Sequence, residues 1–218
     1  LAPINGRPFL DYVIQNLKHM GINEIVFCLH YMAEKIRDYY KDGSRFGVRI
    51  IYSVEEKPLG TGGALGLLSD LLDKTFCVIN ADTYMKIDNI SDFISEHNIR
   101  IATATMALTS VSDHVRYGQV IMDKTKQIRG FIEKGNGIVA GGLVNAGFYL
   151  FEPRIFDYID RDIFVSLEET VFPLMITSGE KIVGYQGVTD FFDIGIPEDY
   201  YSFQQWIGLN TISLEGEG

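Results

Sequence analysis

The spacing of apolar side chains predicts several helices along the chain. Near the start, apolar residues recur every three or four positions from Phe9 to Leu17, which predicts an amphipathic helix over 8–20. Gly21 follows directly, and glycine commonly ends a helix. The same periodicity predicts further helices over 32–41, 61–72, 154–159, 166–177 and 197–207.

Short apolar runs rich in strand-forming residues alternate with these helices. Residues 24–29 and 76–79 are almost wholly apolar, as buried parallel strands are. Further strands are predicted over 47–53, 101–109, 118–122, 127–132, 143–151 and 181–186. The alternation of strands and helices predicts an α/β fold, a Rossmann-like three-layer sandwich with a mostly parallel central sheet.

Composition fits a single globular domain. The chain has 218 residues, of which 46% are hydrophobic and 22% are charged, so it can bury a sizeable core. No linker, repeat or low-complexity tract divides it, and we expect one domain over residues 1–209. Residues 210–218 lack apolar periodicity and are expected to form a tail outside the fold.

The charge of the chain limits its partners. A formal net charge of -10 argues against binding to nucleic acid or to an anionic membrane, because both need a basic surface. No run approaches the ~20 apolar residues of a membrane span, and no cleavable signal is evident, which favours a cytoplasmic protein. Cys28 and Cys77 lie in apolar runs and are expected to be buried, unpaired thiols.

A glycine-rich loop precedes the predicted helix over 61–72. In the sequence from Pro58 to Ala64, Gly60 and Gly62 flank Thr61. Glycines let a backbone approach a base or a phosphate closely, and a helix N-terminus favours an anion. The alternative is a tight strand-to-helix turn that Thr61 caps.

Two carboxylates follow predicted strands. Asp82 comes directly after the strand over 76–79, where ligands of parallel sheets bind, and Asp193 lies in an apolar turn before the last helix. Carboxylates in such places can hold Mg²⁺, which prefers oxygen ligands. Alternatively, Asp82 caps the next turn, and Asp193 caps the last helix or binds its own loop.

Three further motifs contain candidate sugar or phosphate contacts. Glu133 and Lys134 end a predicted strand, where the lysine could neutralise a phosphate; an exposed ion pair is the alternative. Asn145 and Gly147 interrupt an apolar strand, which suggests a ligand or a bulge. Gly118 follows Arg116 and Tyr117 at the head of another strand.

The order of these motifs resembles that of the sugar-1-phosphate nucleotidyltransferase family. PLGTGGA is followed by Asp82, RYG, EK, NAGFYLF and DIGIPEDY, and the resemblance extends from Leu1 to about Trp206. Within the family the chain is most similar to the D-glycero-D-manno-heptose 1-phosphate guanylyltransferases. Mannose-1-phosphate guanylyltransferases and N-acetylmuramate-1-phosphate uridylyltransferases resemble it nearly as well.

The resemblance implies a reaction and its participants. The phosphate oxygen of a sugar 1-phosphate, heptose or mannose 1-phosphate here, would attack the α-phosphorus of a nucleoside triphosphate, GTP in the guanylyltransferases, and release pyrophosphate. Because the nucleophile is already an anion, catalysis would rest on alignment and on charge neutralisation by Mg²⁺ and lysine, with no catalytic histidine. A homo-oligomer stays open.

The resemblance also implies roles for residues. Asp82 and Asp193 match the carboxylates that hold Mg²⁺, and Lys134 matches the lysine at the sugar phosphate. The loop residues match those that read the nucleobase, and the remaining candidates match sugar contacts; these are Gly60, Thr61 and Gly62 for the base, and Gly118, Glu133, Asn145 and Gly147 for the sugar.

Two departures from the family pattern affect the site. Ala81 stands where the family has a glycine, and its methyl group could tighten the floor under the nucleotide. The family also opens with a strand and a glycine-rich loop whose Arg and Lys grip the triphosphate, and these are missing before Leu1. Either the sequence is truncated or the loop has been lost. We expect truncation, and we expect poor turnover until the upstream residues are restored.

Two other classes of function stay open. A glycosyltransferase that consumes a nucleotide sugar would carry a pair of carboxylates spaced as in DxD, but the sequence after Asp82 is Thr83-Tyr84. A non-catalytic, nucleotide-sugar-binding regulatory subunit would explain a missing loop, although Asp82, Lys134 and Asp193 are all present.

Overall fold

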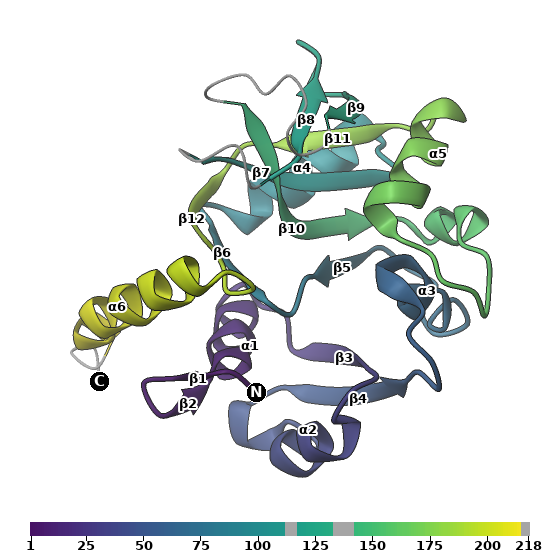
Figure 1. The fold of residues 1–218 in the computed structure, drawn as a ribbon. Coiled ribbons are helices and arrows are strands. Elements are labelled where there is room, and N and C mark those ends of the chain that lie inside the picture. Colours follow the sequence, from purple (N-terminus) through teal and green to yellow (C-terminus); the bar gives the residue numbers. More distant parts are fainter. Residues whose placement is uncertain (112–116, 133–141, 215–218) are drawn as a thin grey trace.

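The computed structural model describes residues 1–111, 117–132 and 142–214, the last four of these by their backbone alone. Its strands lie between layers of helices (Figure 1). The α-helices are α1 Phe9–His19, α2 Ala33–Tyr40, α3 Gly60–Gly66, α4 Ile90–Arg100, α5 Phe172–Thr177 and α6 Pro197–Leu214. A π-helical turn, Leu167–Val171, precedes α5, and short 3₁₀ helices span Ser44–Phe46 and Pro153–Tyr158. Among the described residues, none of the helices is both long and apolar enough to cross a membrane.

The strands form a mixed sheet with smaller ladders around it. They are β1 Pro3–Ile4, β2 Arg7–Pro8, β3 Glu24–Leu29, β4 Arg49–Val54, β5 Phe76–Ile79, β6 Thr83–Ile87, β7 Ala104–Ser110, β8 Gln119–Met122, β9 Ile128–Ile132, β10 Leu143–Phe151, β11 Ile182–Tyr185 and β12 Val188–Asp193. The largest sheet has the order β11-β7-β10-β8-β9, and β5 also pairs with β10. The pairs β1-β2, β3-β4 and β6-β12 lie outside this sheet.

The predicted α/β class is confirmed, but the sheet is mixed rather than mostly parallel. β10 runs antiparallel to β5, β7 and β8, whereas β3-β4 and β7-β11 are parallel. Periodicity identifies strands and not their directions, so it did not reveal that β10 runs against its neighbours. In Figure 1, β7, β10 and β11 occupy the upper half of the molecule, and β3 and β4 lie in the lower half.

Several predicted elements differ from the observed ones. Helix α3 ends at Gly66 instead of residue 72, and α6 continues to Leu214, past the predicted end at 207. Sequence analysis missed α4, β6 and β12; the turn predicted around Asp193 is the end of β12. Cys77 is half-buried and Cys28 is exposed, so the prediction of two buried thiols was wrong for Cys28.

Strands β3 and β5 face the same two hydrophobic clusters without being paired to each other. Val26 of β3 packs with Phe76 and Val78 of β5 against one cluster, and alternate residues of both strands contact the other. Within the described chain, β3 hydrogen-bonds to β4 and β5 hydrogen-bonds to β10, and no ladder joins them. All four residues of β5 remain half-exposed.

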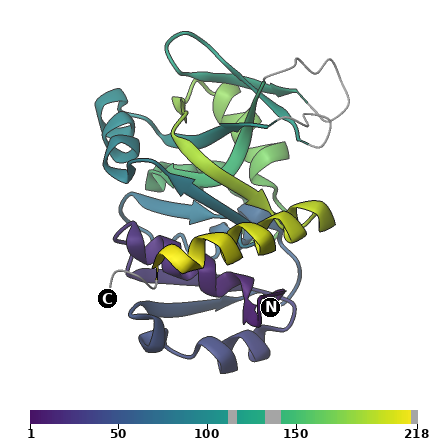
Figure 2. The same ribbon diagram turned by 90° about the vertical axis from the view of Figure 1, so that its left-hand side faces the viewer.

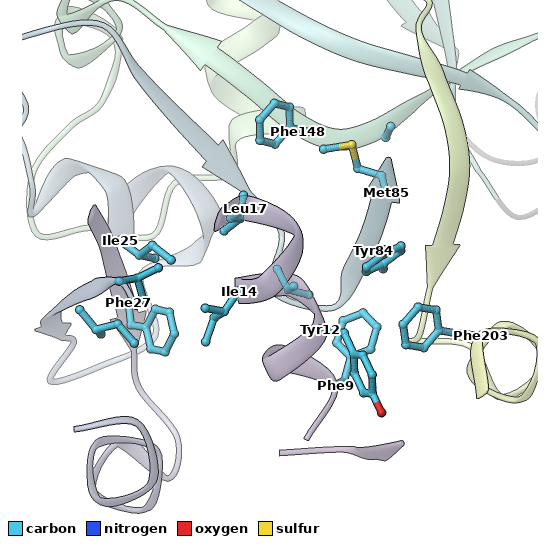
Figure 3. Packing of buried hydrophobic residues seen from close by; sticks show 14 of the residues in the cluster. Phe9, Tyr12, Ile14, Leu17, Ile25, Phe27, Tyr84, Met85, Phe148 and Phe203 are labelled. Atoms are coloured by element: carbon cyan, nitrogen blue, oxygen red, sulfur yellow. The ribbon is translucent and has the colours of Figure 1, made fainter. Parts of the chain in front are cut away.

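Helix α6 packs onto α1 through aromatic side chains. The ring of Phe203 is fully buried, and its centroid lies 5.1 Å from that of Phe9 and 4.9 Å from that of Tyr84 (Figure 3). Figure 2 shows α6 lying across α1, which joins the C-terminal helix to the first helix of the chain. The helix follows β12, so its packing also fixes where β12 ends.

We predict that Phe203→Ala lowers the free energy of unfolding by about 3–5 kcal/mol, because it empties the centre of an aromatic cluster. Urea titration followed by circular dichroism measures the loss. Tyr201→Ala is the matched control on the same helix: Tyr201 is 62% exposed, and its loss should change stability by less than about 0.5 kcal/mol. Equal effects of the two substitutions would show that α6 is not packed as described.

Candidate active site

The carboxylates of Asp82 and Asp193 lie close together. A Cβ atom built on Gly195 would be 3.1 Å from Oδ1 of Asp193 and 3.8 Å from Oδ2 of Asp82. The two oxygens are therefore closer to each other than the sum of these distances. Asp82 is exposed and Asp193 is half-buried, so solvent and small ligands can reach the pair.

Pairing of β6 with β12 brings the two carboxylates together. Asp193 is opposite Thr83 in this antiparallel ladder, and the backbone N–H of Ile194 donates to the carbonyl of Asp82 at 2.9 Å. The N–H of Gly195 donates to Oδ1 of Asp193 at 3.0 Å. Asp193 thus binds its own loop, as one alternative expected, and Asp82 precedes a strand instead of capping a turn.

A bulge in β10 is hydrogen-bonded to the segment that carries Asp82. The register of β10 on β7 shifts between Asn145 and Tyr149, and Gly147 has a φ of +66°. The carbonyl of Gly147 accepts from the N–H of Asn80 at 2.9 Å, two residues before Asp82. Oδ1 of Asn145 accepts from the N–H of Gly147 at 2.9 Å. The bulge expected from Asn145 and Gly147 is therefore present.

The glycine-rich loop is held by the segment that precedes the π-helical turn. Gly60 has a φ of +75°, and a Cβ on it would be 2.6 Å from the carbonyl oxygen of Val165. The N–H groups of Gly62 and Gly63 donate to that same carbonyl at 2.8 and 3.2 Å. Because these two N–H groups already donate to Val165, they are not free to bind a phosphate.

Thr61 makes a long-range contact instead of capping its helix. The residue before α3 is Leu59, which has no side-chain cap. The hydroxyl of Thr61 donates to Oε2 of Glu168 at 3.0 Å and accepts from the N–H of Leu167 at 2.8 Å. The alternative in which Thr61 caps the turn was therefore wrong.

Sequence analysis missed two residues that link the loop to the bulge. The hydroxyl of Tyr149 donates to Oε1 of Glu168 at 3.1 Å and accepts from Nδ2 of Asn145 at 2.7 Å. Tyr149 is fully buried, and this burial, together with the nearby charge of Glu168, raises its pKa well above the ordinary value. The adjacent acids Glu168 and Glu169 at a helix start were visible in the sequence, but pattern alone could not show what they contact.

Gly118 directly precedes β8. A Cβ on it would be 3.1 Å from the carbonyl oxygen of Ile132, the last residue of β9. Its neighbour Tyr117 donates its hydroxyl to Oδ2 of Asp199, in the first turn of α6, at 3.0 Å. The RYG and DIGIPEDY motifs are thereby joined. Glu133, Lys134 and Arg116 lie outside the described residues.

The carboxylate pair fits one hard cation better than a metal cluster. In the part of the chain that the structure describes, no group of three or more His, Cys, Asp or Glu side chains could hold a metal. Two carboxylates leave most positions around a cation to water and to phosphate oxygens, which is how Mg²⁺ is commonly held. The donor set is thus suitable for Mg²⁺ bound together with a phosphate substrate.

Comparison with known proteins identifies the family. The family model described as nucleotidyl transferase matches residues 1–208, nearly the whole chain. This chain belongs to the nucleotidyl transferase family. The predicted resemblance is confirmed, and the motifs that carried it lie within the matched range.

Members of the nucleotidyl transferase family resemble the chain over most of its length. D-glycero-α-D-manno-heptose 1-phosphate guanylyltransferase of Campylobacter jejuni is 35% identical, over 93% of this chain and 87% of its own. Mannose-1-phosphate guanylyltransferase of Mycobacterium tuberculosis is 32% identical over 92% of this chain, which spans only 56% of that relative. HddC of Yersinia pseudotuberculosis, solved in complex with GMP-PN, has a TM-score of 0.82 and 29% identity, covering 94% of this chain and 88% of its own.

We predict that Gly147→Ala destabilises this nucleotidyl transferase more than Gly179→Ala does. Both glycines have a positive φ, so each alanine costs about 1–2 kcal/mol of backbone strain. A Cβ on Gly147 would also be 2.8 Å from Nδ2 of Asn80, whereas nothing lies within 4 Å of a Cβ on Gly179. The clash should add about 1–3 kcal/mol, measured by urea denaturation. Equal losses would mean that Asn80 moves aside freely.

Proposed function

We propose that this chain transfers a guanylyl group from GTP to a sugar 1-phosphate, with heptose 1-phosphate or mannose 1-phosphate as the acceptor. The phosphate oxygen of the sugar attacks the α-phosphorus, the bond to the β-phosphate oxygen breaks, and pyrophosphate leaves. The relatives support this choice, because those described above are heptose and mannose 1-phosphate guanylyltransferases. The product would be a nucleotide-diphospho-sugar for surface polysaccharide synthesis.

The observation that carries the proposal is the position of the carboxylate pair. Asp82 and Asp193 share the space beside Gly195, and Asn80 links Asp82 to the bulge at Gly147. From Asn145, hydrogen bonds continue through Tyr149 and Glu168 to the glycine-rich loop. These contacts connect the glycine-rich loop, Asn145, Gly147 and the segment of Asp82, which supports assigning them to one site.

We assign roles to the residues of this site as follows. Gly60, Thr61 and Gly62 would contact the guanine base, and Gly118, Asn145 and Gly147 would contact the sugar. Asp82 and Asp193 would hold Mg²⁺, which when bound neutralises phosphate charge and helps align the phosphates. Glu133 and Lys134 stay predicted contacts to the sugar and its phosphate.

The chain's own contribution is alignment of two anions. A phosphate monoester is already charged near neutral pH, so the attack needs no strong base. Holding the two substrates in line replaces a bimolecular encounter by a nearly unimolecular step. The site's carboxylates repel phosphates by themselves, which is the physical reason for a cation and for a lysine at position 134.

The two alternative functions are less well supported. A glycosyltransferase of this kind would carry its second carboxylate two positions after Asp82, as in DxD, but Thr83 and Tyr84 follow Asp82 and both are buried in β6. A regulatory subunit without catalytic activity would not need the carboxylates of Asp82 and Asp193 to lie side by side next to Gly195. A cytoplasmic location and a homo-oligomer stay predictions.

We further propose that one more strand fits between β3 and β5. Both strands contact the same clusters, no ladder joins them among the residues that the structure describes, and β5 stays half-exposed along its length. A parallel strand there would satisfy both sets of backbone groups. The loop after it would deliver the donors that a triphosphate needs.

We predict that joining the opening strand and glycine-rich loop of a heptose 1-phosphate guanylyltransferase to Leu1 raises turnover by orders of magnitude. Each charge-assisted hydrogen bond to the triphosphate contributes about 1.5–3 kcal/mol, so several together change the rate greatly. Pyrophosphate release from GTP with mannose or heptose 1-phosphate measures it, with UTP and ATP as comparisons. If the 218-residue chain is already fully active, the groups that bind the triphosphate come from elsewhere in the molecule.

We predict that Asp82→Asn and Asp193→Asn each lower kcat/KM of the extended chain by about a hundredfold or more, because a divalent cation supplies several kcal/mol of charge stabilisation. Pyrophosphate release at several Mg²⁺ concentrations measures the effect. Asp190→Asn is the matched control on β12; Asp190 is half-buried like Asp193 and should tolerate the change. Full activity of both Asp82→Asn and Asp193→Asn would remove the metal from the proposed site.

A further inference from the structure

The carboxylate of Glu168 lies between the glycine-rich loop and the bulge of β10. Three hydroxyl groups donate to it: that of Tyr149 to Oε1 at 3.1 Å, and those of Thr61 and Ser166 to Oε2 at 3.0 and 3.2 Å. Glu168 is half-buried and belongs to a π-helical turn, a distortion that is frequent at functional sites.

An ionised carboxylate accepts hydrogen bonds and cannot donate, so Glu168 fixes the direction of every bond that reaches it. Toward β10, the hydroxyl of Tyr149 must donate to Glu168, which leaves its oxygen to accept from Asn145. The amide nitrogen of Asn145 is therefore turned to Tyr149, and its amide oxygen is turned to the N–H of Gly147. Burial raises the pKa of Tyr149 well above its usual value, so this phenol stays a donor.

The same reasoning applies to the hydrogen bond between Glu168 and the glycine-rich loop. The hydroxyl of Thr61 must donate to Glu168, so its lone pair accepts from the N–H of Leu167 at 2.8 Å. This pair of bonds attaches Thr61 to the segment of Val165, whose carbonyl receives the N–H groups of Gly62 and Gly63. One carboxylate thus sets the orientation of groups on both sides of the site.

We propose that Glu168 is a positioning residue that couples the nucleobase loop to the sugar site. It holds Thr61 on one side and, through Tyr149, fixes which edge of the Asn145 amide faces the bulge on the other. This assignment rests on the proposed function for the roles of the loop and the bulge. As a consequence, the glycine-rich loop and the bulge of β10 are ordered together, and this helps to align the two substrates for in-line attack.

Helix stabilisation is the simpler explanation for an acidic residue in a first turn, and Glu169 separates the two explanations. Glu169 is also in the first turn and is exposed, and its backbone N–H donates to Oγ of Ser166. Glu168→Gln and Glu169→Gln therefore remove the same charge from the same turn. Only Glu168→Gln replaces an acceptor by an NH₂ group within the network.

The first test is amide hydrogen exchange of the 218-residue chain without ligand, which does not depend on activity. In Glu168→Gln we expect the N–H groups of Leu167 and Gly147 to exchange at least about tenfold faster, and in Glu169→Gln we expect neither to change. Tyr149→Phe cuts the path in the middle, so it should speed exchange at Gly147 and spare Leu167. Faster exchange at Leu167 alone in Glu168→Gln, or equal effects of the two glutamine variants, would overturn the coupling.

The second test uses steady-state kinetics of the extended chain with GTP and mannose 1-phosphate. Tyr149→Phe should raise the KM for mannose 1-phosphate about tenfold and leave the KM for GTP within about twofold, whereas Glu168→Gln should raise both. A rise in one KM alone for Glu168→Gln would contradict the proposal. If the unchanged protein releases no pyrophosphate, the proposed function fails, and the exchange experiment still decides whether Glu168 couples the two segments.

Discussion

The hydrogen-bond ladders along β10 are the interaction on which the rest of this structure depends. Buried backbone groups must be paired, and β10 pairs with β7, β5 and β8 along its length. Phe148, Tyr149 and Phe151 are fully buried on this strand, so both hydrophobic clusters are built around it. The bulge at Gly147 is tolerated because these ladders hold the strand on either side of it.

The bulge makes β10 part of the proposed site. In an unbroken strand, the side chains from Asn145 to Tyr149 would alternate regularly between the two faces of the sheet, as they do in the neighbouring strands. The shift in register and the positive φ of Gly147 instead bring Asn145 into contact with both the bulge and Tyr149. The carbonyl of Gly147 also anchors Asn80, so the loop that carries Asp82 is attached to the central sheet.

The C-terminal part of the chain contributes to the proposed site through packing. β12 pairs with β6, and α6 packs its aromatic residues on α1, so Asp193 is fixed between two anchored elements. Tyr117 adds a third attachment through Asp199. An acidic chain can bind anionic substrates beside two carboxylates only if positive charge compensates them. The proposed site therefore combines the two carboxylates with a cation and a lysine.

The sequence by itself determined the family, the α/β class and most of the elements. Helix α1 and strands β3, β5 and β10 were predicted within a residue or two, because apolar periodicity records which side chains must leave water. The motifs containing Asp82, Asp193 and Asn145 were recognisable because glycines, amides and carboxylates within apolar runs are costly without a purpose.

Only the tertiary structure decided how these pieces meet. Strand direction leaves no trace in periodicity, so the antiparallel course of β10 was not predictable, and β12 was mistaken for a turn because its partner β6 was missed. The contacts of Glu168 are with Thr61 and Tyr149, which are far from it along the chain. Hydrogen bonds between distant segments are fixed by the folded arrangement of the backbone, and a linear pattern cannot specify them.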